Sequence, residues 1–233
     1  MDKQTILIMI GLLIVLATVN IIYSNYFQIR EIKIIGNHLL SDQYVLNYSK
    51  VNKKDSIFAI DPENIEDKLL KLSQLKSVEV RRDLPNIVVI EIQERRPIAI
   101  IPFQSSYQVI DAQGWILEVS NNLFNWNLPL ITGVNIKAQE KRINLSGNIE
   151  IAISYLSKLS KKTLVEITEV HVTSQGQFLL FLKQGGEVKL GNKFDIERKA
   201  KMLDLIYQDV KSRNLDVEYI DLRSKGNAFL KIK

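Results

Sequence analysis

The run TILIMIGLLIVLATVNIIYSNYF, residues 5–27, is the first feature to interpret because it contains no charged side chain. As an α-helix its 23 residues would rise roughly 34 Å, enough for a hydrocarbon core of about 30 Å. A cleaved secretory signal is one alternative, but the apolar part is long and no Ala-x-Ala site surrounds Ala17. A buried core helix is the other, although no comparable segment exists to pack around it. The run therefore predicts an uncleaved transmembrane anchor.

The flanking charges do not orient this predicted anchor. Asp2 and Lys3 precede it and Arg30, Glu31 and Lys33 follow it, which is a tie under the positive-inside rule. Only four residues precede the run and 206 follow it, as in exported proteins with a signal anchor. We expect residues 1–4 to be a short cytoplasmic tail of a single-pass type II inner-membrane protein, with the bulk of the chain extracytoplasmic.

The composition restricts the chemistry of the remaining residues. The chain has no cysteine, which excludes disulfides, zinc–thiolate sites and thiol catalysis. Its two histidines, His38 and His171, have no second ligand type at metal spacing. The net charge of +5 arises from interspersed basic and acidic residues, so no basic stripe indicates nucleic acid. We expect no metal, no cofactor, no small-molecule substrate and no nucleic-acid partner.

Residues 28–96 predict a βααββ module. An apolar, β-branched strand precedes the Gly36-Asn37 turn, and Ser41 offers an N-cap for a short helix. Asp61-Pro62 marks a second helix, because aspartate caps it and proline at its first position needs no N–H donor. Two strands follow, around the turn Leu84-Pro85-Asn86. Such a module buries two helices on one face of a three-stranded sheet and leaves the sheet edges available.

Residues 97–233 predict a second, β-rich domain with two helices. Pro97 marks the junction, since proline cannot donate to a central strand. Glycines at the turns favour hairpins, and Asp195 is a candidate N-cap. The expected strands are 98–103, 107–111, 115–119, 165–173, 178–183, 187–190, 219–223 and 228–233, and the expected helices are 147–159 and 195–212. The predicted fold class is α+β, with one transmembrane helix, the βααββ module and this domain.

Several of these motifs resemble one known family. SIFAIDPENIEDKLLKLSQLKSVEVRRDLPNIVVIEIQERRPIAI, the hairpin VIDAQGWILE, VKLGNKFDIERKAKMLDLI and the tetrad IDLR before a glycine turn are similar to FtsQ, called DivIB in Gram-positive bacteria. The resemblance identifies the βααββ module as a POTRA domain. It implies a scaffold of the bacterial divisome, located at the division septum and linking early and late division proteins to septal peptidoglycan synthesis. It also implies FtsB and FtsL as a ternary complex, with FtsW/FtsI-type proteins, FtsK and FtsN as further partners.

The resemblance also implies where partners bind. The last strand would be a docking edge for an FtsB-type protein, through β-augmentation. For the apolar residues of this strand the competing interpretation is an ordinary closing strand whose side chains fill the core. The FtsB-type residues are Arg223, Ser224, Asn227, Ala228, Phe229, Leu230 and Lys231. A second partner edge is expected in the POTRA domain, on either the strand that contains Ile29, Ile32 and Ile34 or the strand that contains Val88 and Ile90.

The sequence does not indicate catalysis. Neither histidine lies in a nucleophile motif such as Gly-x-Ser-x-Gly, and the carboxylate clusters are explained by helix capping and a solvated strand. We expect no enzymatic activity. The alternatives are a POTRA-bearing envelope assembly or secretion factor and a membrane-anchored cell-wall hydrolase. An assembly factor of that kind would normally lead into a barrel, which needs many alternating strands of about ten residues that this sequence does not show.

Overall fold

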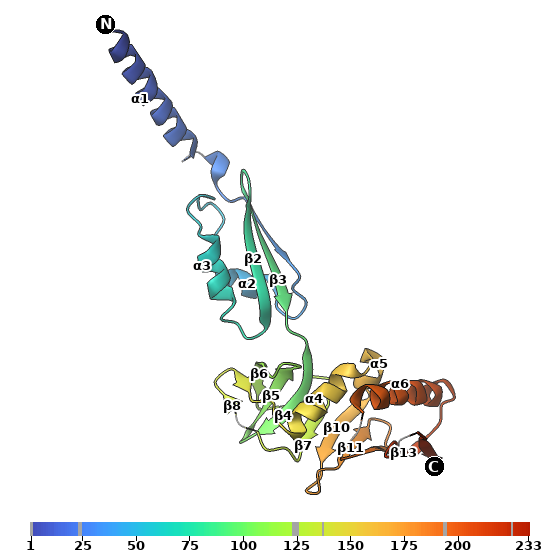
Figure 1. The fold of residues 1–233 in the computed structure, drawn as a ribbon. Helices are drawn as coiled ribbons and strands as arrows, with labels where there is room; N and C mark the ends of the chain where they lie inside the picture. The colour runs from blue at the N-terminus through green and yellow to red at the C-terminus, as the bar shows by residue number, and fades with distance from the viewer. Residues whose placement is uncertain (1, 23–24, 123–125, 137, 193–194, 225) are drawn as a thin grey trace. The chain divides into compact units, whose positions relative to one another are not determined.

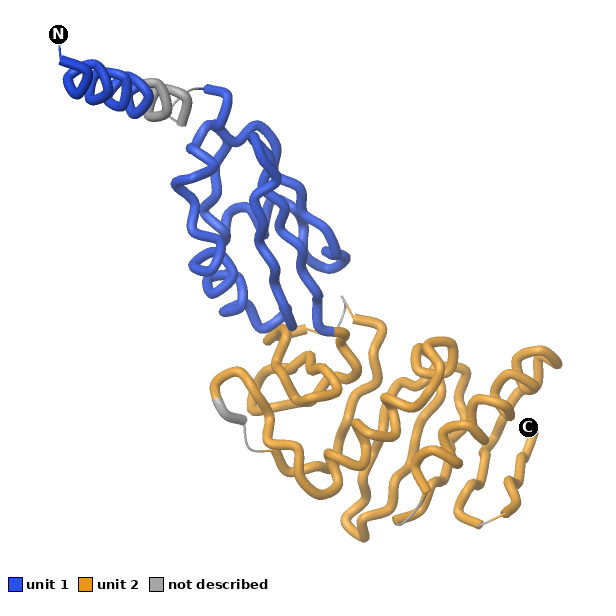
Figure 2. Tube along the Cα trace, turned by 45° about the horizontal axis from the view of Figure 1, so that its top comes forward, with its two compact units in different colours: residues 1–95 blue, residues 96–233 orange. Residues whose placement is uncertain are grey.

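The structure is a computed structural model. It describes residues 2–22, 25–122, 126–136, 138–192, 195–224 and 226–233, without the side chains of residues 17–22, 138 and 139. The chain divides into two compact units, residues 1–95 and 96–233 (Figures 1 and 2).

The first unit opens with helix α1, Lys3–Ile22, followed by a 3₁₀ turn, Asn25–Phe27. No helix among the described residues is both long enough and apolar enough to cross a membrane. The transmembrane anchor predicted over residues 5–27 is therefore wrong. The prediction assumed an α-helix through Phe27, whereas residues 25–27 form a 3₁₀ turn, and residues 5–22 of α1 rise about 27 Å rather than 34 Å.

The POTRA order β-α-α-β-β predicted for the first unit is confirmed. The elements are β1 (Glu31–Ile35), α2 (Asp42–Ser49), α3 (Pro62–Leu69), β2 (Leu75–Asp83) and β3 (Ile87–Glu94). The sheet order is β1-β3-β2, with β1 parallel and β2 antiparallel to β3. The two helices pack against this sheet (Figure 1) around a core that includes Val45, Leu69 and Ile90.

Local capping explains where these helices begin. Ser41 accepts a hydrogen bond from the N–H of Tyr44, and Asp61 accepts one from the N–H of Asn64, with Pro62 at the first helical position. At the end of β1 the chain turns at Gly36, where φ is +90° and an added Cβ would lie 2.1 Å from the carbonyl oxygen of Ile92. The turn predicted at Gly36-Asn37 therefore requires glycine.

The second unit is built on a nine-stranded mixed sheet in the order β14-β13-β12-β11-β10-β7-β4-β5-β6. Its strands are β4 (Pro97–Phe103), β5 (Ser106–Asp111), β6 (Ile116–Ser120), β7 (Leu130–Thr132), β10 (Ile167–Val172), β11 (Phe178–Leu182), β12 (Glu187–Gly191), β13 (Val217–Asp221) and β14 (Phe229–Ile232). A small arm, β8 (Ala138–Gln139) with β9 (Arg142–Ile143), forms a separate pair. Parallel pairing of β7 with β4 and with β10 joins the antiparallel strands β4–β6 to the strands β10–β14, in which β12 and β13 also pair in parallel.

The helices of this unit are α4 (Asn148–Lys158), α5 (Lys161–Leu164) and α6 (Ile196–Ser212). The sequence predicted only two helices, and α5 was missed because its four residues are too short to show helical periodicity. Figure 1 shows α4 and α6 side by side over the sheet, and the Tyr155 hydroxyl donates to the Lys199 carbonyl, 3.4 Å away. The buried Lys199 ammonium donates to the Leu190 carbonyl at 2.7 Å, and burial lowers its pKa.

Candidate partner-binding edge

Strand β14 forms one edge of the nine-stranded sheet and pairs antiparallel with β13. Val217 and Ile220 anchor β13 in the core with 4% and 0% exposure, and Leu222, just beyond it, is 1% exposed. All four residues of β14 are exposed, including Phe229 at 57%, Leu230 at 38% and Ile232 at 46%. The interpretation that Phe229 and Ile232 fill the core is therefore wrong, because no described element covers this end of the sheet.

The direction of the main-chain groups in β14 follows from one backbone hydrogen bond next to it. The N–H of Lys233 donates to the carbonyl of Asp216 at 2.9 Å, toward β13. Because N–H groups alternate in direction along a strand, those of Lys231 and Phe229 also face β13. The N–H and C=O groups of Leu230 and Ile232 then face away from the sheet. This edge presents unpaired main-chain groups together with exposed apolar side chains.

The two faces of β14 differ in chemistry. Lys231 lies opposite Tyr219 in the ladder, its ammonium is 2.8 Å from the Glu218 carboxylate, and the ammonium of Lys189 lies 4.5 Å from the centre of the Tyr219 ring. This face is therefore charged and aromatic. Leu230 lies opposite the buried Ile220, so the other face extends the apolar side of the sheet. The sequence analysis did not identify Tyr219 and Lys189 as part of this face. The alternation of side chains along the strand could have placed Tyr219 on the side of the sheet that faces away from the core.

An ion pair fixes the chain where it leaves β13. The Arg223 guanidinium contacts the Asp221 carboxylate, with Nε–Oδ1 at 2.9 Å and Nη2–Oδ2 at 2.5 Å. Hydrogen bonds from Arg223 hold the pKa of Asp221 below its usual range, and the same carboxylate raises the pKa of Arg223. Asp221 is partly shielded while Arg223 is exposed, so the pair positions the start of the turn at the sheet edge.

The predicted FtsB-type residues lie close together around β14. Arg223, Ser224 and Asn227 are exposed in the connection between β13 and β14, and Ala228 is half-buried against the core. Phe229, Leu230 and Lys231 form most of β14 itself. Lys225, within the predicted turn, lies outside the described residues. The described residues of the predicted set thus lie in or next to β14, the strand that also contains Ile232, to which the predicted docking edge extended.

The predicted POTRA edge is only partly an edge. Val88 and Ile90 are fully buried in the central strand β3, which is paired on both sides, so their prediction as edge residues is wrong. Ile29 precedes β1 and is 1% exposed, and residues 54 and 55 already use its carbonyl and N–H. Ile32 and Ile34 do lie in the edge strand β1, half-buried against the core.

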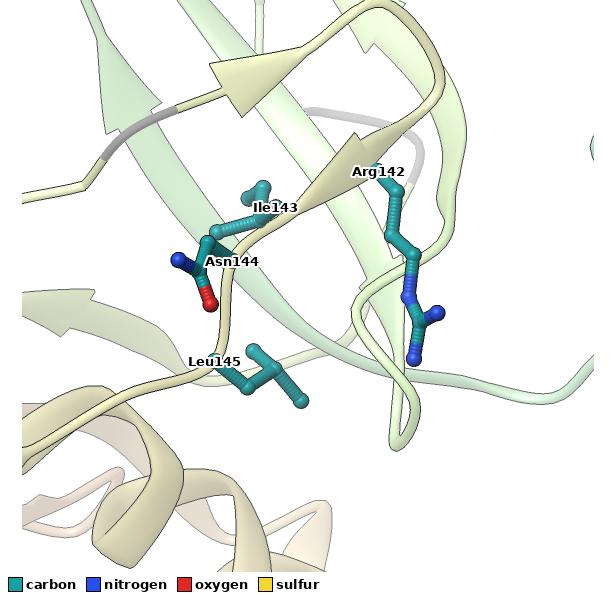
Figure 3. Close-up of a pocket in the computed structure, with 4 residues that line it drawn as sticks. All are labelled: Arg142, Ile143, Asn144 and Leu145. Carbon is teal, nitrogen blue, oxygen red and sulfur yellow. The ribbon is translucent and has the colours of Figure 1, made fainter.

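One pocket of the second unit lies beside the β8–β9 arm, lined by Arg142, Ile143, Asn144 and Leu145 (Figure 3). The Arg142 Nε donates to the carbonyl of Gln113 at 3.0 Å, and its guanidinium lies 5.9 Å from the centre of the Trp115 ring. These contacts attach the arm to the turn before β6. The four described residues that line the pocket carry no carboxylate, imidazole or hydroxyl, so their side chains provide no acid–base pair.

These features define a class of protein: a POTRA module followed by a helix-covered mixed sheet with an open C-terminal edge. The family model for the FtsQ-type POTRA domain matches residues 27–95, and that for the C-terminal part of cell division protein FtsQ/DivIB matches residues 99–223. Because the second match alone covers more than half of the sequence, the chain belongs to the FtsQ/DivIB family of cell division proteins.

Individual relatives carry the same names. Cell division protein DivIB of Clostridium acetobutylicum is 26% identical, covering 87% of this chain and 82% of the relative. Cell division protein FtsQ of Geotalea daltonii is 28% identical, covering 85% and 74%. A solved structure of the major extracytoplasmic domain of DivIB from Geobacillus stearothermophilus, described as the trans isomer, matches with a TM-score of 0.38 and 18% identity, covering 53% of this chain and 99% of that one.

Proposed function

We propose that this chain is a non-catalytic scaffold of the bacterial division machinery that binds a partner strand along β14. The observation that carries this proposal is the open edge of the nine-stranded sheet, where all four residues of β14 are exposed. Exposed, apolar edge strands favour aggregation and are usually protected in soluble proteins. An edge left open therefore supports a role in binding another chain.

The geometry supports β-augmentation as the binding mode. An incoming strand would exchange main-chain hydrogen bonds with Leu230 and Ile232, whose N–H and C=O groups face outward. Side chains on its apolar face would extend the surface made by these two residues. Side chains on its other face would meet Phe229 and Lys231, and Arg223 would lie near the end of the bound strand.

Membership in the family suggests the identity of the partners. The partner on β14 would be an FtsB-type protein, with FtsL joining through it as a ternary complex. FtsW/FtsI-type proteins, FtsK and FtsN would be further members of the assembly at the septum. In this proposal the chain contributes binding surfaces only and links these proteins to septal peptidoglycan synthesis.

Leu230→Pro tests the binding mode directly. Proline removes the outward N–H of Leu230 but leaves the ladder to β13 intact, and edge strands tolerate proline at such positions. Binding of the purified full chain to the host's FtsB-type protein should weaken by about tenfold or more. The partner strand loses its hydrogen bond from the Leu230 N–H, and the proline also misaligns it along β14. The free energy of unfolding should fall by less than about 1 kcal/mol.

Two controls make this experiment specific. Leu205 is 62% exposed on α6, away from β14, and Leu205→Asp should leave partner binding unchanged. In cells, a fluorescent fusion should locate to the septum and depletion should give filaments that Leu230→Pro does not rescue. Normal division after depletion, or full binding by folded Leu230→Pro, would overturn the proposal.

A further inference from the structure

The two edge strands of the POTRA sheet differ in whether side chains occupy their outward main-chain groups. On β2, the Glu66 Oε1 of α3 accepts a hydrogen bond from the N–H of Val80 at 2.7 Å. Val80 lies opposite Ile90 on β3, so an N–H bonded to Glu66 points away from β3, toward the free edge. Arg82, nearer the end of β2, also donates a hydrogen bond to the carbonyl of Ile60 at 2.5 Å.

These contacts obstruct strand addition on β2. An added strand would need the N–H of Val80, which lies in the middle of β2 and is already held by a charged acceptor. The strand would have to displace Glu66 and leave its carboxylate to be solvated again. A charged side chain that reaches around to an edge is one way in which proteins prevent unwanted strand pairing.

The β1 edge lacks such a device among the described residues. Its five residues, Glu31–Ile35, pair with β3 alone. Beside it a groove of about 440 Å³ runs between this strand, α2 and the loop that follows α2. The groove combines apolar, amide and cationic side chains: Ile32, Leu46, Val51, Gln43, Asn47, Asn52, Lys50 and Lys53.

The charged side chains that line this groove are basic. The described residues that line it include two lysines and no aspartate or glutamate. Carboxylates next to lining residues in the sequence have other contacts: Glu31 lies 4.0 Å from Lys33, Asp42 accepts a hydrogen bond from the Asn37 amide at 2.6 Å, and Asp55 accepts the N–H of Asn52 at 3.3 Å. An extended segment with acidic residues would place carboxylates near Lys50 and Lys53 and apolar side chains on the floor between them.

We propose that the POTRA module binds an acidic, extended segment of a second partner protein along β1 and its groove, and that β2 does not bind strands. This rests on the proposed function only in assuming that the module serves protein contacts. It is distinct from the β14 interaction, because it concerns another sheet and a partner of defined charge.

Photocrosslinking with defined peptides tests this proposal. A photoreactive residue replaces Lys33 on β1 or, separately, Glu79 on β2 in the purified full chain. The probes are ten-residue fluorescent peptides that alternate valine with glutamate, or valine with lysine. The Val-Glu peptide should crosslink at position 33 with an apparent affinity about tenfold above that of the Val-Lys peptide, and crosslinking at position 79 should stay at background.

Matched charge reversals identify the source of the selectivity. Lys50→Glu with Lys53→Glu should remove the preference for the Val-Glu peptide, whereas Lys76→Glu, an exposed lysine of β2, should preserve it. Glu66→Ala should make position 79 competent for crosslinking. Equal yields for both peptides, strong crosslinking at position 79 of the unaltered chain, or indifference to the lysine reversals would overturn the inference. Leu230→Pro should not affect any of these yields, so failure here and failure at β14 are distinguishable.

Discussion

The two ends of the nine-stranded sheet contrast in how they meet solvent. At the β6 end, the N–H of Ile116 donates to the carbonyl of Lys141 at 2.9 Å, and the N–H of Ile143 donates to the carbonyl of Gly114 at 2.8 Å. The β8–β9 arm thus covers the start of this edge, and Ile116 is only 7% exposed. At the other end, β14 has no such cover among the described residues. Among the described residues, the chain therefore covers the start of one edge with its own backbone and leaves the β14 edge uncovered, which is the arrangement expected when one edge serves a partner.

Of the substitutions that test this comparison, Ile220→Ala should have the largest effect on the free energy of unfolding. Ile220 is fully buried on β13, directly opposite Leu230 of β14. Its truncation should lower the free energy of unfolding by about 2–5 kcal/mol, because it leaves a cavity in the core. Leu230→Ala should cost less than about 1 kcal/mol, since this side chain is already partly solvated. Denaturant unfolding of both variants measures the difference, and equal losses would show that β14 belongs to the core.

Gly114→Ala should open the protected end of the sheet. Gly114 has φ +83°, and an added Cβ would lie 2.7 Å from the carbonyl oxygen of Ile143 in the arm. We expect a loss of about 1–3 kcal/mol in unfolding free energy and faster hydrogen exchange at Ile116. Gly147→Ala is the matched control, because Gly147 also has positive φ but an added Cβ meets no atom within 4 Å. If both variants behave alike, the strain is conformational only and the arm is not displaced.

Arg223→Gln should have a smaller effect that depends on pH. Arg223 keeps the pKa of Asp221 low in the folded chain, so this interaction stabilises the fold above the ordinary aspartate pKa of about 3.9 and is lost as pH falls through the lower folded value. The variant should lose less than about 1 kcal/mol near pH 7, since Arg223 is exposed, and nothing once Asp221 is protonated in both states. Urea unfolding at several pH values tests this, and a difference that grows toward acid would contradict it.

The smallest expected effect belongs to Arg142→Leu. The guanidinium of Arg142 donates to Gln113 and lies over the Trp115 ring at an exposed site, a contact typically worth about 0.5–1 kcal/mol. Hydrogen exchange at Ile116 should rise slightly, while binding at β14 should not change. A large loss of stability would mean that Arg142 supports more of the sheet than the arm alone.

Local features of the sequence predicted much of the secondary structure. Asp61-Pro62 located the start of α3, and Asp195 located the start of α6, because each aspartate accepts an N–H at a helix terminus wherever the helix lies in the fold. The Gly185-Gly186 pair predicted the turn between β11 and β12, where both glycines have positive φ. The family resemblance was also carried by such local motifs.

Local features predicted strand neighbours and exposure less well. Val88 and Ile90 were expected at an edge but lie in the central strand β3, because β1 pairs with β3 rather than with β2. A run of β-branched residues is typical of a buried strand as well as of an edge, and the sequence pattern does not distinguish them. The short strand β7 and its parallel pairs with β4 and β10 were missed for another reason, because three residues are too few to show a periodic pattern.

The sequence by itself determined the positions of several caps and turns and of the helices α2, α3, α4 and α6, since these depend on contacts between residues a few positions apart. Only the tertiary structure decided which strands lie at edges and which edges are closed. Glu66 closes β2 by accepting a hydrogen bond from Val80, and the β8–β9 arm covers the start of β6. Both contacts join residues that only the fold brings together. The openness of β14 is decided in the same way: its apolar residues fit a core strand by pattern, and they are exposed because no described helix or strand packs over them.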